Sequence, residues 1–234
     1  MNKLKINTNK KSYSIYVGNK ILKNLGSILK KEKILVKKYF IIYDKNIDYL
    51  HIRLIKKILR KKDIFLFKFT TNEQNKSIKS AEKIINHLLK NNFSRNDCII
   101  SIGGGILGDL ACFAASIYKR GMRFVNIPTT LLAQVDASIG GKSGVNHKLF
   151  GKNLIGTFYQ PDLVIADVNF LNTLKKKDII CGYAEILKHG LISHKKNFNN
   201  LEKDYKNILS LKMPKIKDTI IWSCFVKKKN RRKR

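Results

Sequence analysis

The segment CIISIGGGILGD (Cys98–Asp109) decides how this chain is expected to fold. It starts with a mostly apolar run, typical of a buried β-strand, which leads directly into three glycines. Gly103, Gly105 and Gly108 fit the spacing G-x-G-x-x-G, in which absent side chains let a pyrophosphate approach the start of a helix. The acidic residue that usually follows about 20 positions later is missing. A glycine turn between strand and helix also arises for steric reasons, so the motif by itself leaves both interpretations open.

Short apolar runs alternate with amphipathic stretches on both sides of this segment. We predict a hairpin from Lys3–Ile6 and Tyr13–Val17, and further strands at Tyr39–Tyr43, Ile64–Phe69, Cys98–Ile102, Phe124–Ile127 and Leu163–Val168. Helical spacing predicts helices at Lys20–Leu29, Ile47–Leu59, Ile78–Leu89, Leu107–Tyr118, Ile179–Ser193, Phe198–Leu211 and Ile216–Lys228. Alternating strands and helices indicate βαβ units on a parallel sheet, and therefore an α/β fold. Because only helices are predicted after about residue 175, we expect an α/β domain at 1–175 and the start of a helical domain at 176–234.

Composition leaves two explanations for the charge. The 234 residues include 48 basic and 16 acidic side chains, a formal net charge of +32. Such a field attracts polyanions, and a nucleic-acid-binding function would use it. The basic residues are mostly lysines scattered along the chain, without clustered arginines or aromatic platforms, which favours compositional drift. We therefore expect only nonspecific nucleic-acid binding at low salt.

The compartment is inferred from the absence of targeting signals. No apolar stretch is long enough for a signal peptide or a membrane span, so we expect a cytoplasmic protein and no membrane partner. The four cysteines, Cys98, Cys112, Cys181 and Cys224, lack metal-ligand spacing and lie in apolar surroundings. We interpret them as reduced thiols of the core.

A second group of chemically competent residues lies in NIPTTLLAQVDASIGGKSGVN (Asn126–Asn146). Thr129 and Thr130 follow a strand, where hydroxyls bind phosphate or cap a helix. Asp136 interrupts an otherwise apolar helix, so its carboxylate must pair with a cation or face a polar site. Lys142, together with Lys152 and Asn153, gives a cationic, hydrogen-bonding cluster suited to a phosphorylated acid.

Two further carboxylates allow two interpretations each. Asp44 ends a strand, where it could accept hydrogen bonds from ribose hydroxyls or cap the next helix. Glu185 and Lys188 lie three residues apart on one helix face. They are either a surface ion pair or a metal ligand beside a phosphate-binding lysine.

Five segments together resemble one enzyme family. GGGILGD (Gly103–Asp109), KRGMRF (Lys119–Phe124), IPTTLLAQVDASIGGK (Ile127–Lys142), GKNLIGTFYQP (Gly151–Pro161) and GYAEILKHG (Gly182–Gly190) occur in the order and spacing of 3-dehydroquinate synthase. The resemblance covers most of residues 44–190, and the third segment is highly specific. Other sugar-phosphate cyclases, which make cyclitols from heptulose phosphates, are the closest competitors.

The resemblance implies a cytoplasmic lyase of the shikimate pathway. This family converts DAHP, a phosphorylated seven-carbon keto acid, into 3-dehydroquinate and phosphate. It uses NAD for transient oxidation and a divalent metal, zinc or sometimes cobalt, and its members are expected to be homodimers. In this chemistry the cofactor is regenerated, so the protein mainly positions the reactants and binds charge.

The resemblance also assigns residues. NAD contacts are implied at Asp44, Asn46, Glu73, Lys76, Gly104, Gly105, Ile106, Gly108, Asp109, Thr129, Thr130, Lys142, Lys152, Phe170 and Thr173. Catalytic or substrate-binding roles are implied for Asp136, Lys142, Lys152, Asn153, Lys188 and Arg120, the last reaching the site of a partner subunit. Glu185 is implied as one metal ligand.

Departures from the family pattern limit these expectations. Thr71-Asn72-Glu73 replaces Asp-Gly-Glu, and one extra residue between His147 and Gly151 could displace Lys152 and Asn153. The helical second half, which brings two metal-binding histidines, has no match, and none of this chain's five histidines corresponds to those ligands.

The last residues of the sequence lead to two further expectations. We hypothesise a frameshift at Lys227–Lys229, with NRRKR out of frame, and we expect the truncated chain to be inactive as a synthase. The alternatives are another sugar-phosphate cyclase, or a non-catalytic NAD-binding remnant with nonspecific polyanion binding.

Overall fold

A seven-stranded, mostly parallel sheet forms the centre of the molecule, in the order β1-β2-β9-β6-β5-β3-β4. The computed structural model describes residues 1–8 and 11–231. The strands are β1 (Asn2–Asn7), β2 (Ser12–Gly18), β3 (Lys38–Asp44), β4 (Asp63–Phe69), β5 (Cys98–Gly103), β6 (Arg123–Pro128) and β9 (Leu163–Asp167). Only β1 runs antiparallel, against β2, while β2 pairs in parallel with β9. The predicted α/β fold with a parallel sheet is confirmed.

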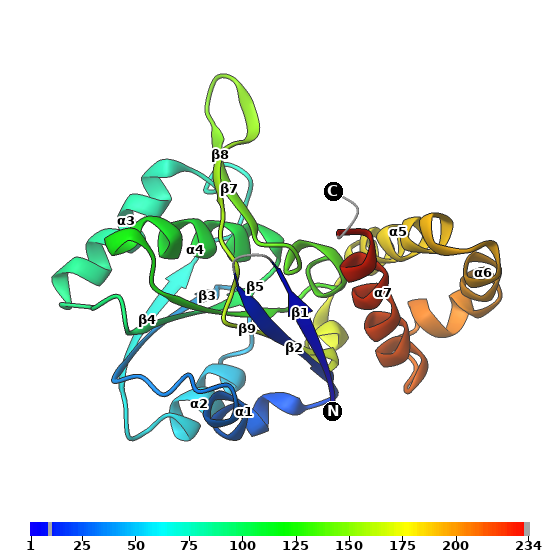
Figure 1. Cartoon of the computed structure of the whole chain (residues 1–234), viewed down its shortest axis with the longest axis horizontal. Coiled ribbons are helices and arrows are strands. Elements are labelled where there is room, and N and C mark those ends of the chain that lie inside the picture. The colour runs from blue at the N-terminus through cyan, green and yellow to red at the C-terminus, as the bar shows by residue number, and fades with distance from the viewer. Residues whose placement is uncertain (9–10, 232–234) are drawn as a thin grey trace.

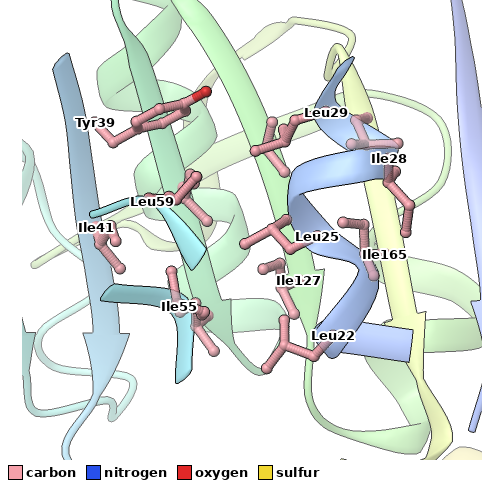
Figure 2. Packing of buried hydrophobic residues seen from close by; sticks show 14 of the residues in the cluster. Leu22, Leu25, Ile28, Leu29, Tyr39, Ile41, Ile55, Leu59, Ile127 and Ile165 are labelled. Carbon is pink, nitrogen blue, oxygen red and sulfur yellow. The ribbon is translucent and has the colours of Figure 1, made fainter. Parts of the chain in front are cut away.

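Helices cover both faces of this sheet (Figure 1). On one face lie α1 (Leu25–Lys31) and α2 (Tyr49–Ile58), and on the other lie α3 (Ile78–Lys90) and α4 (Gly105–Ile117). Side chains of β3 alternate between the two layers: Tyr39 and Ile41 pack with α1 and α2, whereas Phe40 and Ile42 pack with α3 and α4. This alternation follows the two-residue period of a strand, and burial on both sides explains the continuous apolar runs. Figure 2 shows this first layer, whose side chains include Leu25 of α1, Ile55 of α2 and Ile165 of β9.

The predicted helix at Lys20–Leu29 is divided in the structure. A 3₁₀ turn, η1 (Ile21–Asn24), precedes α1. The Asp167 carboxylate accepts hydrogen bonds from the backbone N–H groups of Lys20 and Leu22, at 2.8 and 2.9 Å. Lys20 has a φ of 53°, in the left-handed region, so a regular helix cannot begin at that residue.

The last three helices pack at the β1-β2-β9 side of the sheet (Figure 1). These are α5 (Lys176–Ser193), α6 (Lys195–Leu209) and α7 (Lys215–Arg231). Ile186, Leu201 and Ile220, one from each helix, join a core that also contains Ile15 and Val164 of the sheet. The division into 1–175 and 176–234 stays a prediction. Of the segment NRRKR, the last three residues lie outside the described part of the chain.

A second, two-stranded sheet was not predicted. It is the hairpin of β7 (Lys142–His147) and β8 (Gly151–Phe158), which projects from the α3–α4 side of the molecule (Figure 1). Its sequence lacks clean alternation of apolar and polar residues, and Leu149, Phe150 and Phe158 are exposed. The signal that normally identifies a half-buried strand is therefore absent.

One of the four cysteines departs from the expectation of a core thiol. Cys98, Cys112 and Cys224 are buried, but Cys181 is exposed on α5. Burial raises the pKa of the Cys112 and Cys224 thiols to about 12, so both are protonated near neutral pH. Among the described residues, no helix is both long and apolar enough to span a bilayer.

Candidate functional site

The order of the strands reverses between β3 and β5. From β3 the chain passes through α2 to β4 at the sheet edge, then returns through α3 to β5 on the other side of β3, and continues to β6 and β9. The carboxyl ends of β3 and β5 are Asp44 and Gly103. Open α/β sheets bind ligands in the crevice outside such a switch point. The structure thus brings Asp44 and the glycine loop to the same edge.

The glycine loop leads into α4 without a side-chain cap. Gly104 is the N-cap residue and has no side chain that could bond to the first turn. A Cβ on Gly104 would lie 3.1 Å from Thr130 Cγ2, and one on Gly105 would lie 3.2 Å from Ala137 Cβ. The loop is therefore packed closely against the segment after β6. The N–H groups that begin a helix in this way can bind an anion.

Asp44 does not cap the following helix. Asp48 is the N-cap of α2 and accepts a hydrogen bond from the N–H of Leu50 at 2.9 Å. Asp44 instead accepts one from the N–H of Asn46 at 2.8 Å, in a local turn. Of the two interpretations that the sequence left open, the cap is wrong, and Asp44 remains at the carboxyl end of β3.

The other residues assigned to NAD follow neighbouring strands. Thr129 is buried after β6, and its N–H bonds to the carbonyl of Gly103 at 2.9 Å. Phe170 and Thr173 lie in a 3₁₀ segment, η4 (Val168–Thr173), directly after β9. The rings of Phe170 and His51 are 4.5 Å apart. Ile106 and Gly108 belong to the first turn of α4. All lie at the carboxyl edge of the sheet.

A buried lysine connects the glycine helix to the β7–β8 hairpin. Lys76 Nζ lies 2.6 Å from Asp109 Oδ2 and 2.5 Å from Asn153 Oδ1. Burial raises the pKa of Asp109, and the ammonium of Lys76 opposes that shift. The pair is well shielded from solvent, since only 6% of the Lys76 side chain is exposed. Asp109, an implied NAD contact, and Asn153, an implied substrate contact, therefore both bond to the ammonium group of Lys76.

Contacts beside this lysine hold the tip of the hairpin. Glu73 lies 3.4 Å from Lys152 and accepts a hydrogen bond from Asn146 at 2.9 Å. That hydrogen bond, together with Lys152, lowers the pKa of Glu73. Asn146 also accepts a hydrogen bond from the N–H of Asn153 at 3.0 Å. Despite the extra residue before Gly151, Lys152 and Asn153 thus lie next to Glu73 and Lys76.

Asp136 and Glu185 come together from different parts of the chain. Asp136 lies in a short π-helix, η3 (Ala133–Ala137), rather than in the α-helix expected there. Ligand atoms of Asp136, Glu185 and His189 all lie within 4.8 Å of one another. Lys188 bonds to Glu185 Oε1 at 2.7 Å, and Lys227 of α7 forms a short ion pair with Asp136. The carboxylates thus face cationic groups, as their apolar surroundings require.

His189 is the most buried member of this cluster, with 1% of its surface exposed. Its Nε2 lies 3.4 Å from Glu185 Oε1, and its Nδ1 lies 2.5 Å from Ser223 Oγ on α7. Burial lowers the pKa of His189, against the opposing effect of Glu185. The lowered pKa favours the neutral imidazole, whose Nε2 is directed at Glu185.

The implied substrate residues Lys142 and Arg120 lie on other elements than this cluster. Lys142 begins β7 and, with Gly108 and Asp109, lines a cavity of about 10 Å³, the space of one water molecule. Arg120 is exposed after α4, with a left-handed φ of 62°.

Sequence reasoning missed His189, Ser223, Lys227 and Asn146. The four-residue spacing of Glu185 and His189 on one helix could have indicated the histidine. For Lys227, within a run of lysines, the sequence offers no local signal.

Comparison with known proteins identifies the family. A family model described as 3-dehydroquinate synthase N-terminal matches residues 66–181. The 3-dehydroquinate synthase of Pelagibacter ubique is 54% identical over 227 residues, which cover 97% of this chain and 61% of the relative. The chain thus spans about three fifths of the length of that relative.

Two solved structures share the fold. One is a 2-deoxy-scyllo-inosose synthase complexed with carbaglucose-6-phosphate, NAD⁺ and Co²⁺, with a TM-score of 0.87 and 24% identity over 97% of this chain and 62% of that one. The other is a 2-epi-5-epi-valiolone synthase from Streptomyces hygroscopicus with NAD⁺ and Zn²⁺ bound, with a TM-score of 0.82 and 26% identity over 94% of this chain and 61% of that one. The sequence matches show that the chain belongs to the 3-dehydroquinate synthase family.

Proposed function

We propose that this chain binds NAD at the β3–β5 switch point and provides the cofactor-binding part of a 3-dehydroquinate synthase. The reaction is the NAD- and divalent-metal-dependent conversion of DAHP into 3-dehydroquinate and phosphate. Because the chain spans about 61% of its Pelagibacter relative, the cofactor-binding role is the part that its own residues support.

The observation that carries this proposal is the arrangement around Lys76. Asp44 and the glycine loop lie at the same edge of the sheet, and Lys76 joins Asp109 of the helix after that loop to Asn153 of the hairpin. A dinucleotide in the crevice would lie beside the residues implied to contact substrate. The residues present also fit NAD chemically, since the uncapped start of α4 suits a pyrophosphate and Asp44 suits ribose hydroxyls.

The chemistry divides between the bound groups and the side chains. When bound, NAD would exchange a hydride with a substrate alcohol, and a divalent metal held through Glu185 would polarise a substrate oxygen. Lys142, Lys152 and Lys188 are exposed ammonium groups suited to the phosphate and carboxylate of the substrate. Asp136 would accept a hydrogen bond from a substrate hydroxyl. The role of these residues is to bind and orient, which suits a reaction whose bond changes are driven by the cofactor.

The remaining family properties enter as expectations. We propose a homodimer in which Arg120, exposed at the end of α4, reaches the site of the partner subunit. A cytoplasmic location is likewise proposed from the family. The substrate is expected to be DAHP rather than the substrate of another cyclase, since the 54% identity is to a 3-dehydroquinate synthase.

NAD binding tests the proposal directly. The full chain is titrated with NAD, and the heat of binding is measured by calorimetry. We expect saturable binding. The Asp44→Ala variant is expected to raise Kd by about tenfold or more, equivalent to ~1.4 kcal/mol. Asp48→Ala is the matched control, because Asp48 lies on the same loop and caps α2. No binding by the wild type, or equal effects of both variants, would overturn the assignment.

Turnover separates the enzyme from the alternatives. Phosphate release is measured with DAHP and with a non-acidic heptulose phosphate, each with NAD and Co²⁺ present. Release from DAHP alone supports the synthase, and release from the heptulose phosphate indicates another cyclase. NAD binding without release from either identifies a non-catalytic NAD-binding protein.

A further inference from the structure

We infer that an open cavity at the ends of α1 and α2 binds a small amphipathic carboxylate, a molecule with an apolar body about the size of one ring and one anionic group. The cavity has a volume of about 240 Å³. Its wall is apolar and its rim is cationic, and this combination defines the class of ligand. None of its lining residues belongs to the proposed NAD or substrate contacts, so the inference stands apart from the proposed function.

The cavity lies at the opposite edge of the sheet from the NAD residues. Tyr39, which lines it, is the second residue of β3, and Asp44 is the last. At ~3.3 Å per residue, the two positions are roughly 16 Å apart along the strand. Ile58 and Leu59, at the end of α2, also line the cavity. A ligand bound there would leave the switch-point crevice open.

The wall of the cavity offers mainly apolar surface. Leu29, Tyr39 and Leu59, which are buried members of the first layer (Figure 2), form part of it. The Tyr39 hydroxyl donates a hydrogen bond to the carbonyl of Ile34 at 2.8 Å, so its polar atom is already satisfied within the protein. An apolar cavity of about 150 Å³ can hold a benzene ring. This cavity therefore has room for a ring and a short side arm.

The rim of the cavity supplies positive charge. Arg60, Lys61 and Lys62 follow the end of α2, and all three are exposed. Among the described residues, none of the three has an ion-pair partner, and no acidic residue lines the cavity. A guanidinium presents paired donors that match a carboxylate, and the ammonium groups beside it add to the positive potential. Lysines are common on this surface, but these cations adjoin an apolar cavity, as in sites for ligands with an apolar body and a polar group.

Leu35 lies at the mouth of the cavity and is 62% exposed, although it is apolar. It belongs to the loop between α1 and β3. A ligand in the cavity would remove part of this side chain from water, which favours binding. Because Leu35 is exposed, its replacement should have little effect on the stability of the fold. It is therefore the position at which ligand binding can be changed without disturbing the core.

Titration with 3-phenylpropanoate tests the inference. The isotope-labelled full chain is titrated at about 150 mM salt, where the net charge is screened beyond ~8 Å, and amide chemical shifts give the Kd and the site. We expect saturable shifts centred on Leu35 and residues 58–62. Leu35→Asp places a like charge at the mouth and is expected to raise Kd by about tenfold or more. Arg60→Gln should raise it by about fivefold, the upper range for an exposed ion pair.

The matched control for the first variant is Leu50→Asp. Leu50 is 64% exposed, similar to Leu35, but it lies on α2 outside the cavity lining, so Kd should not change. Arg53→Gln, an exposed arginine of α2 outside the lining, is the control for Arg60→Gln. Circular dichroism checks that each variant folds. Two further probes separate the wall from the rim: 3-phenylpropanamide keeps the ring without the charge, and sulfate keeps the charge without the ring. Each should bind more weakly than 3-phenylpropanoate.

Four outcomes would overturn the inference. One is the absence of saturable binding by the wild type, and another is an equal effect of Leu35→Asp and Leu50→Asp. Equal affinity for sulfate would indicate a cationic surface alone, and equal affinity for the amide would indicate an apolar cavity without anion recognition. Finally, a dimer that Leu35→Asp dissociates in sedimentation would show that a second copy of the chain covers the cavity.

Discussion

At the scale of single residues, Gly182 determines how closely α5 approaches the Asp136 segment. A Cβ on Gly182 would lie 2.6 Å from Leu131 Cβ and 2.7 Å from the backbone nitrogen of Leu132. Backbone cannot move aside as a flexible side chain can. Glu185 is one turn further along α5, and Asp136 follows shortly after Leu132. The missing side chain therefore allows the two carboxylates to face one another.

Replacing this glycine should cost stability. Gly182→Ala is expected to lower the free energy of unfolding by ~1–3 kcal/mol, the usual cost of overpacking. Urea denaturation of the full chain measures the change. Ala184→Ser, an exposed change on the same helix, is the control and should stay within about 0.5 kcal/mol of the wild type. Equal stability of the two variants would contradict the close packing assigned to Gly182.

At the scale of elements, one carboxylate joins the N-terminal hairpin to the end of α1. Glu32 accepts hydrogen bonds from Ser14 Oγ at 2.9 Å and Tyr16 OH at 2.5 Å, and pairs with Lys3 at 2.7 Å. Burial alone would raise the pKa of Glu32, but these three partners together lower it. The ionised form is therefore favoured in the folded state.

The stability contributed by Glu32 should depend on pH. Because its pKa is lower in the folded chain than its usual value of 4.5, the contribution is full above that pH and is lost as pH falls below it. Glu32→Gln is expected to lose roughly 1–2 kcal/mol at pH 7, and the gap should close in acid. Denaturation at a series of pH values measures it. The exposed Glu82→Gln serves as the control, and a gap that persists well below pH 4 would contradict the ionic explanation.

At the scale of the whole molecule, the net charge of +32 acts over the entire surface. Lysines such as Lys188 and Lys76 have local carboxylate partners, but 48 basic residues exceed 16 acidic ones threefold. Association with polyanions is therefore expected from charge alone.

Salt should abolish that association. Two oligonucleotides of unrelated sequence are expected to bind with similar affinity at 50 mM salt. A protein with about 6–10 phosphate contacts should lose ~10³-fold or more of that affinity by 200 mM. Fluorescence anisotropy gives both values. Binding that persists at the higher salt and prefers one sequence would instead support a selected nucleic-acid function.

Local patterns sufficed for most of the fold. The strands and helices are near their expected positions because apolar periodicity reports which face of an element is buried. The β7–β8 hairpin was missed for the same reason, since its apolar residues Leu149, Phe150 and Phe158 are exposed. The start of α2 also differed, because capping depends on which of two nearby carboxylates, Asp44 or Asp48, meets the helix N–H groups.

The sequence by itself determined the α/β class, the glycine loop and the residues that the family motifs single out. Only the tertiary structure decided which of them meet. Lys227 reaches Asp136 across 91 positions, and Lys76 reaches Asn153 across 77. Periodicity describes the backbone within one element, whereas these contacts depend on how elements pack, down to the absent side chain of Gly182. His189 could not be placed from the sequence for the same reason, because Asp136 and Ser223 lie far from it in sequence and beside it in the fold.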